Sequence, residues 1–428
     1  MMKVAFHTLG CKVNSYESEA MLELFNKAGY EEVNFKDQAD VYVINTCTVT
    51  NTGDSKSRQM IRRAIRLNPK ATIVVCGCYS QTAPKDIENI KGVSIILGTQ
   101  YRNEIVELVS LFQTNHQRIV KVDDLKNNQK FEDLNIDTFH NTRAYLKIQD
   151  GCNNFCTYCI IPYARGRVRS RSKDSVLNQA KILISKGYNE IVLTGIHTAG
   201  YGMDLKDYSF YNLLKDLVKL DGLKRLRISS IEISQITDEI IDLIASSKVI
   251  VNHLHVPCQS GCDATLKRMN RKYDTKEYID KIKEIREKIP GIALTTDIIV
   301  GFPGEDENEF KQTIEFIKEV NYSMLHVFPY SKRTGTKAAS MDNQVDESIK
   351  HQRTKTLIAL SNELNKEFAL SQIGKVIPVL FEKEEDGYYV GHGDDYLNIR
   401  VKGDKELIGN IKDVKITEYE DGLIGQVI

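Results

Sequence analysis

The sequence has no excess charge of either sign and no long hydrophobic run. Its 428 residues contain 58 Lys and Arg against 58 Asp and Glu, so no overall field would attract the whole chain to nucleic acid or to a membrane. No apolar stretch approaches the length of a membrane-spanning helix, and the first residues do not resemble a targeting signal. We therefore expect a cytoplasmic protein with no membrane partner, in which any RNA contact depends on local basic patches.

The sequence also lacks a fourth cysteine near its densest cysteine motif. Cys152, Cys156 and Cys159 follow the strand-like segment AYLKIQDG with C-x3-C-x2-C spacing. Structural zinc sites use four ligands, whereas a cubane iron–sulfur cluster held by three thiolates keeps one iron open for chemistry. The motif predicts such a [4Fe-4S] cluster. A zinc site completed by a distant Cys or His is the alternative.

Three further cysteines occur at equivalent positions near the N-terminus. Cys11, Cys47 and Cys78 each follow a strand-like segment, about one strand–helix unit apart. In an open parallel sheet the loops beyond the carboxyl ends of the strands lie at one edge, so these thiols can meet there. They predict a second three-cysteine site, with simple burial as the alternative. We interpret Cys76 as a core residue.

Cys258 and Cys262 form a third cysteine pair, in the segment HVPCQSGCD. We interpret both as buried packing residues. A redox pair or a third metal site is the alternative.

Hydrophobic periodicity divides the chain into three domains. Alternating strands and helices in 1–113 predict a parallel-sheet domain. Residues 114–140 are polar and aperiodic, which indicates a linker. Six strand–helix units in 141–370 predict a partial or full (β/α) barrel, and short strands separated by Gly and Asp in 371–428 predict a small β-barrel. The expected fold class is α/β with this small terminal barrel.

The C-x3-C-x2-C motif resembles that of the radical S-adenosylmethionine superfamily, in which the open iron is chelated by the amino and carboxylate groups of S-adenosylmethionine. The resemblance implies that Tyr158, before the last cysteine, packs on the adenine side. It also implies cofactor contacts at the strand ends. Gly195 would allow close approach of the backbone to the methionine amino group. Ser229 and Glu232 would contact hydroxyl groups, and Gly301 and Gly304 would turn backbone amides toward the ligand.

Longer segments resemble the radical methylthiotransferases over nearly the whole chain. FHTLGCKVNSYESEAM, VYVINTCTVTNTGD and GCYSQ are similar to the N-terminal domain of that family, which carries an auxiliary cluster. The terminal strands look like its TRAM domain. HTLGCKVN, LTGIHTAGYG and HVFPYSKRTGT are most similar to the branch that acts on N6-threonylcarbamoyladenosine beside the anticodon of tRNA.

This resemblance implies conversion of that base to its 2-methylthio form. One S-adenosylmethionine would methylate a sulfur on the auxiliary cluster, and a second would be cleaved to a deoxyadenosyl radical that activates the base carbon. The implied cofactors are two [4Fe-4S] clusters and S-adenosylmethionine, and the implied partners are the tRNA anticodon stem-loop and an external reductant. Alternatives are a sibling acting on isopentenyladenosine or a ribosomal-protein aspartate, and a non-catalytic RNA-binding or electron-carrying iron–sulfur protein.

Candidate RNA contacts lie mainly in two basic runs, SRQMIRRAIR and ARGRVRSR, that follow predicted cluster cysteines. A basic run is often only a solvated face, but these two are expected to rim the site and hold phosphates. From Gly374 onward, acidic residues outnumber basic ones twelve to seven, so the terminal domain offers few such contacts. The candidates are Arg62, Arg63, Arg167, Arg169, Arg400 and Lys402.

Overall fold

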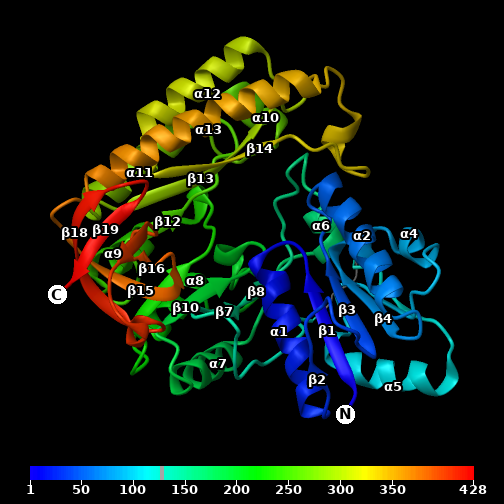
Figure 1. Cartoon of the computed structure of the whole chain (residues 1–428). Coiled ribbons are helices and arrows are strands. Elements are labelled where there is room, and N and C mark those ends of the chain that lie inside the picture. The colour runs from blue at the N-terminus through cyan, green and yellow to red at the C-terminus, as the bar shows by residue number, and fades with distance from the viewer. Residues whose placement is uncertain (126–129) are drawn as a thin grey trace.

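Three bodies of secondary structure follow one another along the chain (Figure 1). The computed structural model describes residues 1–125 and 130–428. It contains a parallel N-terminal sheet, a central arc of parallel strands and a closed five-stranded C-terminal barrel. The predicted α/β fold class with a small terminal barrel is therefore confirmed. No helix in the described ranges combines the length and the apolar character needed to cross a membrane.

The N-terminal sheet has the strand order β2-β1-β3-β4-β5-β6, and all its strands are parallel. Helices α2 and α4 cover one face, while α1 and α5 cover the other. Successive residues of β3 and β4 point to opposite faces, and Cys76 lies in the core beneath α1 and α5, as predicted. The strands are β1 (Lys3–Thr8), β2 (Glu31–Glu32), β3 (Val41–Thr46), β4 (Thr72–Gly77), β5 (Ile95–Leu97) and β6 (Ile119–Lys121). The helices are α1 (Lys12–Lys27), α2 (Asn51–Leu67), α3 (Cys78–Thr82), α4 (Pro84–Glu88) and α5 (Ile105–Asn115).

The stretch predicted as a polar linker, 114–140, is packed against both neighbouring domains, apart from residues 126–129, which lie outside the described residues. Its strand β6 is the edge of the N-terminal sheet. Leu134 and Ile136 are buried in the core of the central domain. The prediction missed this packing because β6 is only three residues long and the buried apolar residues have no regular period. We propose that the N-terminal domain ends after β6.

The central domain is an open barrel in which the six strands predicted from the sequence follow one another. Two three-stranded parallel sheets, β11-β10-β7 and β12-β13-β14, are joined by the isolated bridges Leu226–Ile250 and Ser230–His255. The strands are β7 (Ala144–Lys147), β10 (Glu190–Thr194), β11 (Arg225–Ile228), β12 (His253–His255), β13 (Ala293–Val300) and β14 (Met324–Pro329). A short antiparallel pair, β8 (Gln149–Asp150) and β9 (Arg169–Ser170), follows β7. The helices are α6 (Ile161–Arg165), α7 (Lys173–Ser185), α8 (Phe210–Leu217), α9 (Asp238–Ser246), α10 (Asp263–Arg268), α11 (Thr275–Lys288), α12 (Glu307–Val320) and α13 (Glu347–Leu370).

The N-terminal domain contacts both edges of this open barrel. Glu17 of α1 forms an ion pair with Lys147 of β7, with 2.7 Å between Oε1 and Nζ. Beyond the other edge strand, β14, Arg333 forms an ion pair of 2.7 Å with Asp54 of α2. The N-terminal domain thus spans the gap between β7 and β14, which the described strands do not close.

The C-terminal barrel consists of the five strands predicted from the sequence, in the closed order β15-β16-β17-β19-β18. The strands are β15 (Val376–Glu385), β16 (Tyr388–Gly393), β17 (Asn398–Val401), β18 (Ile411–Tyr419) and β19 (Leu423–Val427). Two buried arginines of β11 hold it against the central domain. Arg225 and Arg227 both donate to the Gly393 carbonyl oxygen, at 3.0 and 3.2 Å, and both pair with the buried Glu190.

Replacing Arg227 by alanine should loosen the C-terminal barrel. The change removes a hydrogen bond to Gly393, a contact with the Tyr396 ring and one of the two cations beside Glu190. Breaking a buried ion pair costs about 3–5 kcal/mol of stability. Because Arg225 remains beside Glu190, we expect the barrel to lose stability near the lower end of that range. Hydrogen exchange along β16 and β17 measures it.

Lys383→Ala is the matched control, because its ion pair with Glu385 is exposed and such pairs contribute only about 0–1 kcal/mol. Equal exchange protection in Arg227→Ala and the unmodified chain would contradict the docking role of Arg227.

Candidate active site

Cys11, Cys47 and Cys78 lie at the carboxyl ends of three neighbouring strands, as the sequence predicted. Cys11 is the N-cap residue of α1, Cys47 directly follows β3, and Cys78 is the first residue of α3. The sheet order β1-β3-β4 brings these loops side by side. A β-carbon at Gly10 would lie only 3.1 Å from Cys47 Sγ, so the Cys11 loop packs directly on Cys47.

The environment of Cys78 shows that this triad is electrostatically connected. Burial raises the pKa of the Cys78 thiol to about 11, Arg165 acts against this, and the charges of Cys11 and Cys47 add to the increase. Arg165 Nε donates to Cys78 Sγ at 3.2 Å. Since Arg165 ends α6 of the central domain, a residue of one domain contacts a predicted ligand in the other.

Cys152, Cys156 and Cys159 lie in the loop between β8 and α6. Burial raises the pKa of Cys159 to about 12, and the nearby charges of Cys156 and Cys152 add to it. Cys152 Sγ accepts a hydrogen bond from the Asn154 backbone N–H at 3.5 Å. All three thiols thus belong to one short loop, and their joint binding of a cluster stays a prediction.

A second buried arginine contacts this triad. Arg271 Nη1 donates to Cys156 Sγ at 3.3 Å, and Nη2 donates to Glu232 Oε1 at 2.6 Å. Arg271 Nε is bonded to the Tyr273 hydroxyl. In each cysteine triad, one sulfur thus accepts a hydrogen bond from a buried arginine guanidinium.

A mostly apolar cavity of about 290 Å³ lies between the loop after Cys47 and the loop that holds Cys159. From the N-terminal domain, Val49 and Thr50, just after Cys47, line it. From the barrel, Tyr158 and Cys159 line the side of the radical motif, and the ends of β13 and β14 supply Ile299 and Phe328. Cys159 is the one cysteine of the two triads among the lining residues, and the loop after Cys47 forms the opposite wall.

The sequence was compared with known protein families and proteins. Residues 146–317 match the Radical SAM superfamily, and residues 3–98 match a family described as "Uncharacterized protein family UPF0004". A Bacillus subtilis protein named threonylcarbamoyladenosine tRNA methylthiotransferase MtaB is 52% identical, over 100% of this chain and 97% of its own length. This chain belongs to the radical S-adenosylmethionine methylthiotransferase family.

More distant relatives in this family carry two different names. The Aquifex aeolicus protein, also named threonylcarbamoyladenosine tRNA methylthiotransferase MtaB, is 40% identical over 95% of this chain and 98% of its own length. A tRNA-2-methylthio-N(6)-dimethylallyladenosine synthase of Carboxydothermus hydrogenoformans is 37% identical over 96% of both chains.

Solved structures share the fold at low sequence identity. The radical S-adenosylmethionine methyltransferase TsrM from Kitasatospora setae matches with a TM-score of 0.58 at 15% identity, over 79% of this chain and 77% of that chain. This match supports the architecture of a radical S-adenosylmethionine enzyme and says nothing about the substrate.

Membership of the methylthiotransferase family implies S-adenosylmethionine and a [4Fe-4S] cluster as cofactors. Within residues 1–125 and 130–428, no three Cys, His, Asp or Glu side chains are grouped as ligands of one metal ion would be. A cubane cluster makes a different demand, because each thiolate binds a different iron. Three cysteines of one loop, with N–H donors on the sulfurs of Cys152 and Cys156, are a donor set that fits such a cluster.

The predicted S-adenosylmethionine contacts do not share one environment. Tyr158 lines the apolar cavity described above, and Glu232 Oε1 accepts a hydrogen bond from Arg271. The buried Ser229 Oγ has no hydrogen-bond partner among the described residues, so it is available to a ligand. Sequence reasoning missed the buried His197, whose pKa is lowered by burial and raised in part by the nearby Glu232. Its place in LTGIHTAGYG was the available signal.

The predicted glycine contacts serve the protein's own packing. A β-carbon at Gly195 would come within 2.9 Å of Gln149 Oε1. The Gly301 N–H donates to Glu305 Oε1 at 2.8 Å, and the Gly304 N–H donates to the Asn343 carbonyl. These glycines therefore do not present the free amides that we predicted for Gly301 and Gly304, because nearby acceptors already take their hydrogens.

The predicted RNA-binding residues divide into exposed and buried groups. Arg62 and Arg167 are exposed, and Arg63 is partly exposed. Arg169 is 6% exposed and donates to the Arg165 carbonyl, so it does not lie on the expected rim. Both residues of the short strand β9, Arg169 and Ser170, are buried, so packing rather than strand alternation places Arg169 inside. On the C-terminal barrel, Arg400 and Lys402 both lie over the Tyr388 ring.

Cys258 and Cys262 are both buried, as the packing interpretation predicted. Burial raises the pKa of Cys258 to about 12, and its Sγ donates to the Ser260 carbonyl oxygen at 3.0 Å. Cys258 therefore fills the core as a small buried side chain whose thiol hydrogen is already bonded to a backbone carbonyl.

Replacing Cys258 by alanine should therefore leave the iron content per chain unchanged. In the unmodified protein, iodoacetamide at pH 8 should modify Cys258 only after denaturation, which peptide mass spectrometry can measure. Cys159→Ala is the control and should lose iron. Equal iron loss in the two variants would favour a third metal site at Cys258.

Proposed function

We propose that this chain is a tRNA methylthiotransferase that converts N6-threonylcarbamoyladenosine beside the anticodon to its 2-methylthio derivative. The main support is 52% identity along the whole chain to a protein named for this activity, against 37% to one named for dimethylallyladenosine. The proposal includes two [4Fe-4S] clusters, an external reductant, the anticodon stem-loop as substrate and the cytoplasm as compartment.

In this proposal, the two triads have separate ligand roles. Cys152, Cys156 and Cys159 would hold the cluster that binds and cleaves S-adenosylmethionine. The other three, Cys11, Cys47 and Cys78, would hold the auxiliary cluster. Bound together, these cofactors supply the carbon radical and the methylated sulfur.

The chain's own residues would orient the reactants. The apolar cavity between Thr50 and Tyr158 excludes water from a reacting base, and Ser229 and Glu232 offer polar contacts to S-adenosylmethionine. The ion pair of Arg333 with Asp54 holds the loop after Cys47 at the edge of that cavity. In this proposal, the N-terminal and central domains would hold both triads around one reaction space.

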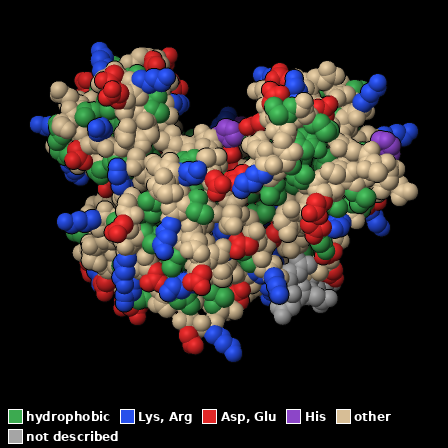
Figure 2. Space-filling view, turned by 90° about the horizontal axis from the view of Figure 1, so that it is seen from below, with side chains coloured by type: hydrophobic (Ala, Val, Ile, Leu, Met, Phe, Trp, Pro, Cys, Tyr) green, Lys and Arg blue, Asp and Glu red, His purple; other side chains and the backbone are tan. Residues whose placement is uncertain are grey.

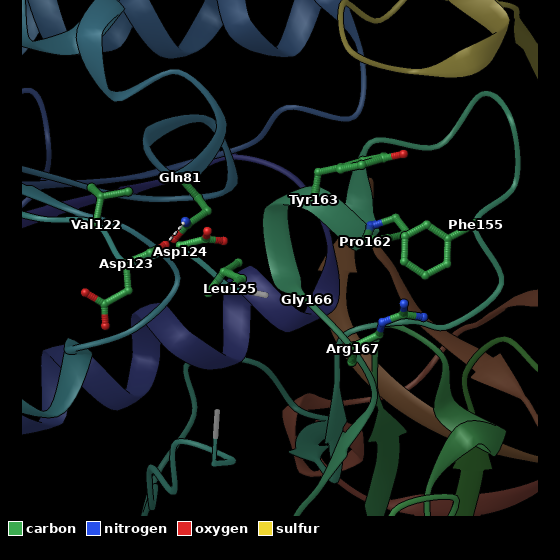
Figure 3. A pocket seen from close by; sticks show the side chains of 10 residues that line it. All are labelled: Gln81, Val122, Asp123, Asp124, Leu125, Phe155, Pro162, Tyr163, Gly166 and Arg167. Carbon is green, nitrogen blue, oxygen red and sulfur yellow. Dashed lines mark hydrogen bonds between the residues drawn. The ribbon is translucent and has the colours of Figure 1, made fainter. Parts of the chain in front are cut away.

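A surface beside the triads has the character of a single-stranded RNA site. Figure 3 shows Arg167 pointing toward Phe155 in a cavity of about 540 Å³, with Gln81 of the N-terminal domain and Asp123, two residues after β6, opposite. Arg167 Cζ lies 4.4 Å from the Phe155 ring centroid, and the exposed Tyr163 ring is 6.0 Å from that of Phe155. Aromatic rings and guanidinium planes are the surfaces on which unpaired RNA bases stack.

A test of the proposed activity uses reconstituted protein, reductant, S-adenosylmethionine and tRNA carrying either modified adenosine. We expect the 2-methylthio product on N6-threonylcarbamoyladenosine, measured by nucleoside mass spectrometry. Replacing Cys11, Cys47 and Cys78 by alanine should abolish this product but leave formation of 5′-deoxyadenosine, because that cleavage requires only the other cluster. Replacing Cys152, Cys156 and Cys159 should abolish both.

Circular dichroism must show that both variants are folded, since cluster binding also stabilises folded protein. Product formed on isopentenyladenosine alone would contradict the proposed substrate. Methylthiolation by the folded variant without Cys11, Cys47 and Cys78 would contradict the two-cluster assignment.

Arg167→Ala should weaken binding of the anticodon stem-loop and reduce the slope of log affinity against log salt by about 0.7–0.9. The physical reason is the loss of one phosphate contact and one stacking surface. Lys283→Ala, an exposed cation on α11, is the control. Figure 2 shows that basic and acidic side chains are interspersed over one face of the molecule, so loss of a single surface cation has no general effect on RNA affinity. Equal slopes for the two variants would exclude Arg167 as an RNA contact.

A further inference from the structure

We propose that Arg165, a residue of the central domain, sets the reduction potential of the cluster held by Cys11, Cys47 and Cys78. This inference rests on the proposed two-cluster function. It assigns to one arginine of the ARGRVRSR run a role that differs from phosphate binding.

The Arg165 guanidinium is fixed in place by contacts on all three nitrogens. Nε donates to Cys78 Sγ at 3.2 Å, and Nη1 donates to Glu17 Oε1 at 2.6 Å. Nη2 donates to Asn14 Oδ1 at 2.6 Å and to Glu17 Oε2 at 3.0 Å. These hydrogen bonds hold the guanidinium beside the sulfur. Because the residue is 0% exposed, solvent does not screen its charge from that sulfur.

The network around Arg165 has a surplus of positive charge. Among the described residues, four cations and three carboxylates are joined by ion pairs. The cations are Arg102, Lys147, Arg165 and Arg169, and the carboxylates are those of Glu17, Glu132 and Asp150. One positive charge is therefore not neutralised within the network, and Arg165 is the member that contacts Cys78.

This surplus charge has a direct consequence for a bound cluster. One-electron reduction adds a negative charge to the iron–sulfur core and its thiolates. A buried cation that donates a hydrogen bond to a ligand sulfur stabilises the reduced form, which raises the reduction potential. Arg271 makes the equivalent contact with Cys156, but it is paired with Glu232 and provides the matched comparison.

The same contact would connect the two cluster sites. Helix α6 begins two residues after Cys159 and ends at Arg165. The position of the radical loop therefore determines where the guanidinium lies relative to Cys78. The potential of the N-terminal cluster would depend on the seating of the two domains, in addition to its own three ligands.

Redox titration followed by electron paramagnetic resonance tests this inference in the full-length chain. The Cys152, Cys156 and Cys159 triple-alanine background isolates the N-terminal cluster. In that background, Arg165→Gln should lower the reduced-to-oxidised ratio at a fixed potential by tenfold or more, a shift of about 59 mV for a one-electron couple. Arg271→Gln is the matched control and should cause no shift there, although it should lower the potential of the other cluster in the reciprocal background.

Arg165→Gln is expected to fold, because three cations and three carboxylates then remain and Glu17 keeps Arg102 and Lys147. If it does not fold, the inference is tested with Arg165→Lys. This variant keeps the charge but loses the planar guanidinium contact, so we expect a smaller fall in the reduction potential than for Arg165→Gln. An unchanged potential in a folded Arg165 variant would overturn the inference. Failure of any cluster to assemble on Cys11, Cys47 and Cys78 would instead overturn the proposed two-cluster function.

Discussion

The arrangement of the two triads depends on the buried ionic network around Glu17. Burial alone would raise the pKa of this carboxyl group, yet Arg102, Arg165 and Lys147 together lower it to about 2. Glu17 belongs to the N-terminal domain, whereas Lys147 and Arg165 belong to the central domain. Buried ion pairs contribute little net stability but are costly to break one partner at a time. The network therefore specifies one seating of the domains.

That seating converts an open barrel into an enclosed reaction space. The described strands leave β7 and β14 as free edges, and the N-terminal domain contacts both through Lys147 and Arg333. Because the carboxyl ends of its central strands face this gap, the loops after Cys47 and Cys159 border one cavity. A fold that closed its own barrel would leave no gap between β7 and β14 for the N-terminal domain to occupy.

The sequence predicted those features of the fold and the site that depend on residues close together in the chain. The strands of the central arc, the strands of the terminal barrel and the loop positions of Cys11, Cys47 and Cys78 all follow from short-range patterns. The packing of Leu134 and Ile136 in the segment 114–140 could not be read from the sequence, since it depends on a core built from distant residues. Glu17 was the overlooked signal: a carboxylate on the buried face of α1, beside Asn14 and Met21, requires a cationic partner.

The sequence by itself determined the chemical type of the site, because three cysteines at fixed spacing are a ligand set before the chain folds. It also placed arginines at alternate positions in ARGRVRSR. Only the tertiary structure decided that Arg167 faces solvent while Arg165 and Arg169 are buried. The physical reason is that a guanidinium is stable inside a protein only where carboxylates from other segments meet it. Asp150 meets Arg165 within the central domain, whereas Glu17 reaches it only after the N-terminal and central domains have come together.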